Sequence, residues 1–151
     1  MVVVKNFLDC PEHLPQIAGW IHDEFWSDKP GHSAASMLER ISKGKRDSLP
    51  IGLAIFEGAH PLGTVSLIDA DLGERPDLSP WLAALYVDPA GRSKGLGKTL
   101  VESCIHEARR LGYPTLYLHT TISSFYERMG WRVYSKVRNS DAVIMTTETT
   151  S

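Results

Sequence analysis

Glycines and cations alternate in residues 92–98, Arg-Ser-Lys-Gly-Leu-Gly-Lys. The apolar run 81–87 precedes this stretch, and a helical pattern starts inside it at Leu96. The first amides of a helix have no partners within the helix, and the helix dipole favours negative charge at that end. Glycines let a phosphate approach the main chain, and cations add charge-assisted contacts. The stretch therefore predicts a pyrophosphate-binding loop.

Two known glycine loops each differ from this stretch by one residue. A Walker A loop needs a glycine, four residues and then Gly-Lys-Ser/Thr. Residues 97–99 match its end, but its first glycine would fall on Arg92. A Rossmann fingerprint needs a third glycine where Leu100 stands. A nucleotide-binding P-loop protein remains an alternative, although residues 117–120, Tyr-Leu-His-Thr, supply no Walker B acid.

Two motifs together indicate a family. Residues 92–97 resemble the Gln/Arg-x-x-Gly-x-Gly/Ala signature of the GNAT N-acetyltransferase superfamily, and residues 125–131, Phe-Tyr-Glu-Arg-Met-Gly-Trp, resemble its Phe-Tyr-x-x-x-Gly-Phe segment. They stand in the right order, and the resemblance covers roughly residues 50–137. It implies an acetyl-CoA-dependent enzyme that moves the acetyl group directly to a primary amine of a small molecule or a peptide N-terminus.

The resemblance also implies where acetyl-CoA, the co-substrate, would lie. Strands 81–87 and 115–119 would splay apart around its acetyl and pantetheine parts, and the loop amides would hold its pyrophosphate. Relatives often bind the pantetheine through an asparagine, which the connection 120–124 lacks, so a serine or threonine there would substitute. The predicted cofactor-binding residues are Leu85, Tyr86, Val87, Arg92, Ser93, Lys94, Gly95, Leu96, Gly97, Lys98 and Ser124.

Direct transfer needs a neutral amine, a stabilised oxyanion and a protonated leaving thiolate. The resemblance assigns the general acid to Tyr126, whose hydroxyl would face the sulfur, with a packed aromatic as its alternative role. A backbone N–H near Leu85 would stabilise the oxyanion. No nucleophilic cysteine is expected, and Cys104, on the apolar stripe of the helix at 96–111, should belong to the core.

The general base is where the chain departs from its relatives. Many of them carry a glutamate near the position of Trp81, and an indole cannot take a proton. His119 ends the next strand, and an imidazole exchanges protons near neutral pH. Two alternatives stay open. Either a backbone carbonyl satisfies His119, or a loop acid acts through water, namely Asp69, Asp71, Glu74 or Asp77.

Segments that wall the acceptor pocket in this superfamily carry carboxylates beside aromatics here, which would suit a cationic amine. They are Trp20, His22, Glu24, Trp26, Asp28, Asp71 and Asp77, and the alternative is that they are solvated charges and core tryptophans. No metal is predicted, because His106 and Glu107 form no recognised metal spacing. A non-catalytic acyl-CoA sensor on the same fold is a second alternative function, favoured by Trp81.

Size and composition set broad limits. We expect residues 1–151 to form a single N-acetyltransferase domain. A net charge of -2 gives no reason to expect nucleic acid or an anionic membrane as partner. No apolar run approaches the roughly 20 residues that span a bilayer, and two cysteines suggest no disulfide framework, so we expect a cytoplasmic protein. The oligomeric state stays open, with a homodimer as one alternative.

Hydrophobic periodicity gives the order β-α-α-β-β-β-α-β-α-β-β. The fold class implied is α/β, a GNAT-like mixed, largely antiparallel sheet of about seven strands flanked by four helices, with a splayed parallel pair. The first helix, 11–25, carries an apolar stripe of Leu14, Ile17, Ala18, Ile21 and Phe25. Strand 81–87 is almost wholly apolar, which predicts cover on both faces.

Overall fold

The strands form one sheet, which confirms the predicted fold class. The computed structural model describes residues 1–150, so Ser151 of the predicted domain lies outside the described residues. Seven strands follow the order β1-β2-β3-β4-β5-β7-β6, and only β4 and β5 are parallel among these described neighbours. Their bounds are β1 Val2–Asn6, β2 Ile51–Glu57, β3 His60–Ile68, β4 Trp81–Val87, β5 Thr115–Thr120, β6 Arg132–Lys136 and β7 Val143–Glu148.

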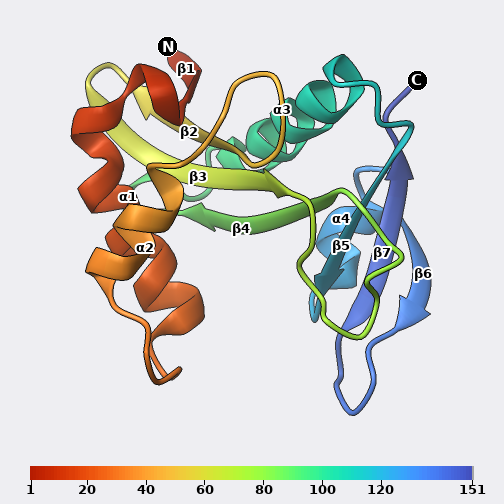
Figure 1. Ribbon diagram of the computed structural model, residues 1–151. Helices are drawn as coiled ribbons and strands as arrows, with labels where there is room; N and C mark the ends of the chain where they lie inside the picture. Colours follow the sequence, from red (N-terminus) through yellow and green to blue (C-terminus); the bar gives the residue numbers. More distant parts are fainter. Residues whose placement is uncertain (151) are drawn as a thin grey trace.

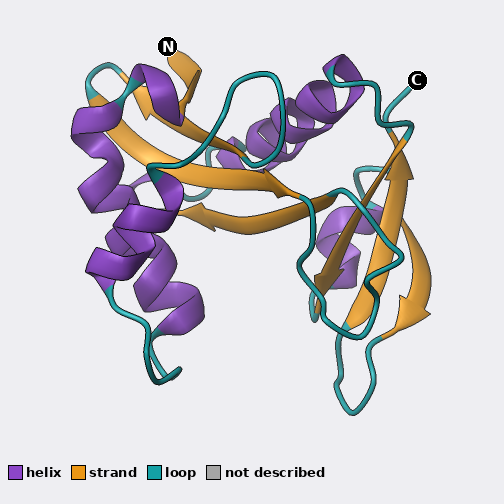
Figure 2. Cartoon of the chain, in the orientation of Figure 1, coloured by secondary structure: helices purple, strands orange, loops and turns teal. Residues whose placement is uncertain are grey.

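Helices cover both faces of this sheet (Figure 1). Their bounds are α1 Leu14–Ile21, α2 Ala34–Ile41, α3 Leu96–Arg110 and α4 Ser123–Glu127, with short turns at η1 Phe7–Asp9, η2 Pro11–His13, η3 His22–Trp26 and η4 Pro89–Gly91. In β2, Ala54 and Phe56 pack with α1, whereas Leu53 and Ile55 pack with α3. Successive side chains of a strand point to opposite faces, so α1 and α3 lie on opposite sides. Figure 2 shows the helices in these two groups around the strands.

The first predicted helix is regular only over α1. The chain then widens into the π-helical turn η3, in which each amide bonds five residues back. This winding rotates Phe25 out of the apolar stripe, and the residue is 38% exposed. The other members of the predicted stripe, Leu14, Ile17, Ala18 and Ile21, are buried. Within residues 1–150, no helix combines the length and hydrophobicity that crossing a membrane requires.

The position of α3 depends on a close approach to the sheet. A Cβ at Gly63 of β3 would lie 2.8 Å from the Tyr86 carbonyl oxygen and 3.0 Å from Leu100 Cδ1, so only glycine fits there. Cys104 of α3 is fully buried, as predicted, and burial raises the pKa of its thiol. Cys10 is buried as well, and burial raises its pKa too. The packing places the first turn of α3 beside the end of β4.

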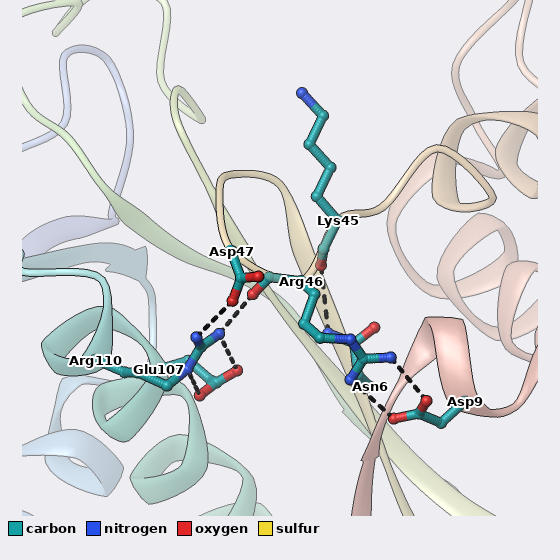
Figure 3. A network of polar contacts seen from close by, with 7 residues as sticks. All are labelled: Asn6, Asp9, Lys45, Arg46, Asp47, Glu107 and Arg110. Atoms are coloured by element: carbon teal, nitrogen blue, oxygen red, sulfur yellow. Dashed lines mark hydrogen bonds and ion pairs between the residues drawn. The ribbon is translucent and has the colours of Figure 1, made fainter.

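Charged side chains tie the loop between α2 and β2 to two other parts of the chain (Figure 3). Arg46 donates two hydrogen bonds to the Asp9 carboxylate, at 2.7 and 3.1 Å. Beside it, Asp47 accepts a hydrogen bond from Arg110 at 2.9 Å, and Glu107 accepts one from the same guanidinium at 2.9 Å. The loop therefore connects the segment after β1 to the last turn of α3.

This network lines a cavity of about 630 Å³ between β1 and α3. Its two guanidiniums, those of Arg46 and Arg110, are already paired with carboxylates. The Lys5 ammonium lies over the Phe56 ring, 4.9 Å from its centroid. Because these cations already have partners in the protein, we assign them a structural role: the ion pairs that line the cavity hold α3 against the neighbouring loop.

The Arg46–Asp9 pair makes stability depend on pH in a defined direction. The hydrogen bond from Arg46 holds the pKa of the Asp9 carboxyl below its ordinary value of 3.8. A lowered folded pKa stabilises the protein above the ordinary carboxyl pKa, and the contribution is lost as pH falls through the folded value. We expect Asp9→Asn to lower the urea midpoint slightly at pH 7 and to have no effect in strong acid.

The matched control is Asp141→Asn, because Asp141 is exposed and makes no ion pair within the described residues. Urea titrations of both variants across the acid range check the prediction. A midpoint difference for Asp9→Asn that stays constant with pH would contradict it.

Candidate active site

The parallel strands β4 and β5 touch at one point and then separate. Their register holds a single pair, Trp81 with Tyr117, and the Tyr117 amide donates to the Pro80 carbonyl at 3.1 Å. Beyond this point, β4 pairs with β3 only. The separation agrees with the predicted splay, and it opens the sheet beside the C-terminal half of β4.

A bulge in β4 lies at this opening. Thr64 of β3 pairs with Tyr86 and Ser66 pairs with Ala83, so residues 84 and 85 have no register partner. Ala84 adopts a positive φ of 54°, which is strained for a residue with a side chain. The Asp88 amide donates to the Leu62 carbonyl of β3, and pairing alternates along a regular stretch of strand, so the Val87 N–H faces the β5 side.

The second half of β4 is less buried than its first half, although side chains pack on both of its faces, as predicted. Trp81 and Leu82 are buried, but Leu85, Tyr86 and Val87 are only partly so. Leu85 and Val87 pack against the core cluster that includes α3, and Ala84 packs against the cluster that includes α1. The separation of β5 leaves the edge of this half of β4 without a neighbouring strand. Partly exposed apolar side chains and the Val87 N–H therefore lie together at the opening, where a ligand can cover both.

The predicted pyrophosphate loop follows through η4 and leads into α3. Ser93 and Gly95 both have positive φ, 66° and 75°, and Gly95 is the N-cap of α3 without a side-chain cap. Within the described chain, the backbone N–H groups of residues 93–98 have no hydrogen-bond acceptor, whereas the Thr99 amide donates to the Gly95 carbonyl at 3.2 Å. This run of open donors at a helix N-terminus is a site for an anion.

The three predicted cations of the loop differ in their surroundings. Arg92 donates from Nε to the Val87 carbonyl at 3.0 Å, so it turns back toward β4. Lys94 Nζ lies 3.6 Å from Glu57 Oε1, which offsets its charge. Lys98 has no acidic partner among residues 1–150 and lines a cavity of about 400 Å³ with Arg128. Lys98 and Arg128 are therefore the cations left for a ligand.

Helix α4 carries two further predicted site residues, Ser124 and Tyr126. Ser124 is exposed in its first turn. Tyr126 is buried, and burial raises its pKa to about 12, so the phenol keeps its proton at neutral pH. Its hydroxyl makes no hydrogen bond with the described residues, although its ring packs against Trp131 at 5.8 Å between centroids. The Trp131 indole N–H is buried and equally unpaired within residues 1–150.

His119 lies on the other face of the sheet from Tyr126. Leu116 and Leu118 of β5 pack into the core with α3 and Tyr126, so His119 faces away by alternation. Its Nε2 lies 2.9 Å from Asp71 Oδ2. This contact connects two groups that the sequence offered as separate candidates for the base. The structure therefore places His119 and Tyr126 on opposite faces of the sheet and not side by side.

The other proposed acceptor-side residues have contacts of their own. The remaining loop acids pair elsewhere, Asp69 with Ser79 Oγ, Glu74 with the Arg138 amide and Asp77 with Arg75. The Trp26 ring is covered by Lys29 and Arg40, with centroid distances of 4.9 and 5.5 Å. Trp20 packs on Tyr86 at 5.6 Å, beside the opening. Cationic side chains of the protein itself thus cover the ring of Trp26, whereas the ring of Trp20 lies beside β4.

Two features of the site escaped the sequence analysis. The bulge at Ala84 has no sequence signal, because alanine does not favour positive φ. The contacts of Trp81 were not predicted either: its indole N–H donates to the Leu78 carbonyl at 2.7 Å, and its ring contacts His119 with centroids 6.0 Å apart. Its full burial agrees with the predicted cover of strand 81–87.

Comparison with known proteins gives a consistent result. Residues 15–131 match the family model described as the acetyltransferase (GNAT) family. The chain is similar to the peptidyl-lysine N-acetyltransferase YjaB of Salmonella typhimurium, with 29% identity over 104 residues, which are 69% of this chain. The matched part spans 65% of that relative's length.

Two solved structures have the same fold. A GNAT-family acetyltransferase from Staphylococcus aureus superimposes with a TM-score of 0.73 at 16% identity, covering 99% of this chain and 100% of that one. An aminoglycoside 6'-N-acetyltransferase complexed with coenzyme A gives a TM-score of 0.74 at 17% identity, covering 99% and 98%. At such identities the likeness concerns the fold.

Proposed function

Because this chain belongs to the acetyltransferase (GNAT) family, whose members use acetyl-CoA as co-substrate, we propose that it moves the acetyl group of acetyl-CoA directly to a primary amine. The observation that carries the proposal is the run of open N–H donors in residues 93–98 beside the β4–β5 opening. Neither alternative, a P-loop protein or a non-catalytic sensor, has support from the fold or the family. We also propose one N-acetyltransferase domain over residues 1–151 and a cytoplasmic location, which suits two free cysteines.

The cofactor would lie along the second half of β4. The peptide group of Leu85 and the N–H of Val87 would pair with its acetyl and pantetheine parts, and the amides of residues 93–98 would bind the pyrophosphate. The cavity between α3 and α4, lined by Lys98 and Arg128, would take the nucleotide end. Ser124, exposed in the first turn of α4, would contact the pantetheine.

The chemistry would use groups from both faces of the sheet. His119 would take a proton from the ammonium form of the acceptor, and the neutral amine would attack the thioester carbonyl carbon. The Leu85 amide would donate to the oxyanion while the C–N bond forms and the C–S bond breaks. Tyr126 would protonate the leaving thiolate. Each turnover releases one proton overall, since an ammonium ion becomes an amide and the thioester becomes a thiol.

The acceptor is a small-molecule amine or a peptide N-terminus in this proposal, and the lysine side chain acetylated by the relative adds a third class. A panel of a lysine peptide, a lysine-blocked peptide with a free N-terminus, spermidine and an aminoglycoside tests it, with released CoA thiol as the signal. Turnover of at least one amine supports the proposal. Calorimetric binding of acetyl-CoA without turnover of any amine would overturn it in favour of the sensor.

A pair of glycines at the two ends of α3 tests the pyrophosphate loop. Gly95 and Gly112 have φ of 75° and 90°, and neither has an atom within 4 Å of a Cβ added there. Alanine at either position costs about 1–2 kcal/mol, because the left-handed conformation is strained. We expect both Gly→Ala variants to lose this much unfolding free energy. Only Gly95→Ala should bind CoA more weakly, by about fivefold or more, because a Cβ there would obstruct the approach of the pyrophosphate to the loop backbone.

Urea unfolding and isothermal calorimetry with CoA measure the two effects separately. Because Gly112→Ala carries the same strain far from the loop, it controls for a general loss of stability. Equal losses of CoA affinity in the two variants would remove the loop from the binding site.

Tyr126→Phe tests the general acid. We expect kcat to fall on the order of 10²-fold, because a positioned general acid typically contributes this much or more. The KM for acetyl-CoA and the unfolding free energy should stay nearly constant, since the hydroxyl has no hydrogen bond within the described protein. Tyr113→Phe, after the C-terminus of α3, is the control. If kcat of Tyr126→Phe equals that of the wild type, Tyr126 has only a packing role.

A further inference from the structure

The hairpin between β2 and β3 lies beside the start of the predicted pyrophosphate loop. The Asp88 amide donates to the Leu62 carbonyl at 2.8 Å, and a Cβ added to Gly91 would lie 3.1 Å from Leu62 Cβ. Glu57 is the last residue of β2 and pairs with His60 across the hairpin. A paired strand therefore carries the Glu57 carboxylate to the edge of the loop.

Glu57 contacts one of the loop cations. Its Oε1 lies 3.6 Å from Lys94 Nζ, and the side chains are about half exposed, at 50% for Glu57 and 47% for Lys94. This distance is longer than a hydrogen bond, so the attraction is Coulombic and solvent can screen it. Asp88, which precedes the loop, serves the turn η4 instead, because it accepts a hydrogen bond from the Ala90 amide at 3.1 Å.

The backbone of Lys94 belongs to the run of open N–H donors in residues 93–98. A flexible four-carbon stem joins the ammonium to that backbone, so the ammonium can turn toward a group bound at the amides. A diphosphate there carries more negative charge than one carboxylate, and it can accept charge-assisted hydrogen bonds from the ammonium. Glu57 and a bound diphosphate therefore attract the same ammonium.

We propose that Glu57 is a positioning residue for Lys94, which competes with the diphosphate of CoA and lowers the affinity of the loop for the coenzyme. The inference rests on the proposed function and deepens it. Without CoA, the Lys94 ammonium lies beside Glu57. When CoA binds, the ammonium moves to the diphosphate, and the Glu57 carboxylate is left to the solvent. Loss of the ion pair opposes binding, and its return favours the release of product CoA.

Glu57→Gln tests this competition by isothermal calorimetry with CoA at low ionic strength. We expect the variant to bind CoA about two- to fivefold more tightly, which is the range of an exposed ion pair. A damaged structure would weaken binding, so a gain of affinity is not the effect of a merely structural role. Glu39→Gln is the matched control, because Glu39 lies 3.6 Å from Lys43 at the end of α2. Unchanged or weaker CoA binding by Glu57→Gln would overturn the inference.

Two further titrations identify the cause of the gain. Salt screens exposed charges, and the Debye length is about 3 Å at 1 M salt, so the gain of Glu57→Gln should disappear there. Lys94→Met keeps a stem of similar length without the charge, and in this background Glu57→Gln should give little or no gain. A gain that persists at 1 M salt, or that is complete without Lys94, would show that Glu57 does not act through the Lys94 ammonium.

Binding and turnover separate this inference from the proposed function. If the wild type and Glu57→Gln bind CoA equally well, the inference is wrong, while the acetyltransferase function stands. If Glu57→Gln binds CoA more tightly but the wild type acetylates no amine, the competition for Lys94 is supported and the proposed transfer is wrong. If the wild type binds no CoA, both are wrong.

Discussion

A peptide group that loses its strand partner must find another, and this constraint governs the middle of the sheet. β4 and β5 share one pair, at Trp81 and Tyr117, before they separate. Unpaired backbone groups in a partly buried place cost free energy, so packing must hold the separation open. Trp81 does so from one face, in a cluster with Leu78 and Ile144, and α3 supports the strands from the other. The bulge at Ala84 is the local strain that accompanies this arrangement.

Unpaired donors occur in two adjacent segments of the chain for different reasons. On β4 they arise because β5 diverges, and in residues 96–98 because the first amides of a helix have no partner within the helix. Residues 93–95 form the turn that leads into α3. Only the short turn η4 lies between these segments, and α3 is held close to the sheet through the space left at Gly63. An extended ligand with amide groups at one end and a diphosphate further along matches the order of these donors along the chain.

The sequence predicts this fold well where periodic burial dictates structure. The element order, α3 and the start of β4 all follow from apolar spacing, and the glycine loop follows from the needs of a helix N-terminus. The π-helical turn η3 could not be predicted, because its residues also satisfy an α-helical pattern. The contact between Asp71 and His119 is a tertiary one, between a loop and a strand, so no spacing along the chain encodes it.

The cations of the loop 92–98 also have surroundings that the sequence does not reveal. Arg92, Lys94 and Lys98 look equivalent in the sequence, but the fold gives the first a carbonyl partner and the second a carboxylate partner. What a cation can do depends on neighbours from other strands. Residue type and spacing therefore identify the segment that binds, whereas the tertiary structure decides which of its side chains remain available.

The burial of both thiols has a practical consequence. Cys10 and Cys104 are fully enclosed, and burial raises the pKa of each, so neither presents a reactive thiolate to the solvent. A colorimetric disulfide reagent mixed with the folded enzyme would meet no protein thiol at the surface of residues 1–150. Colour that develops during turnover would then count coenzyme molecules, and a slow background rise would report unfolding of the polypeptide.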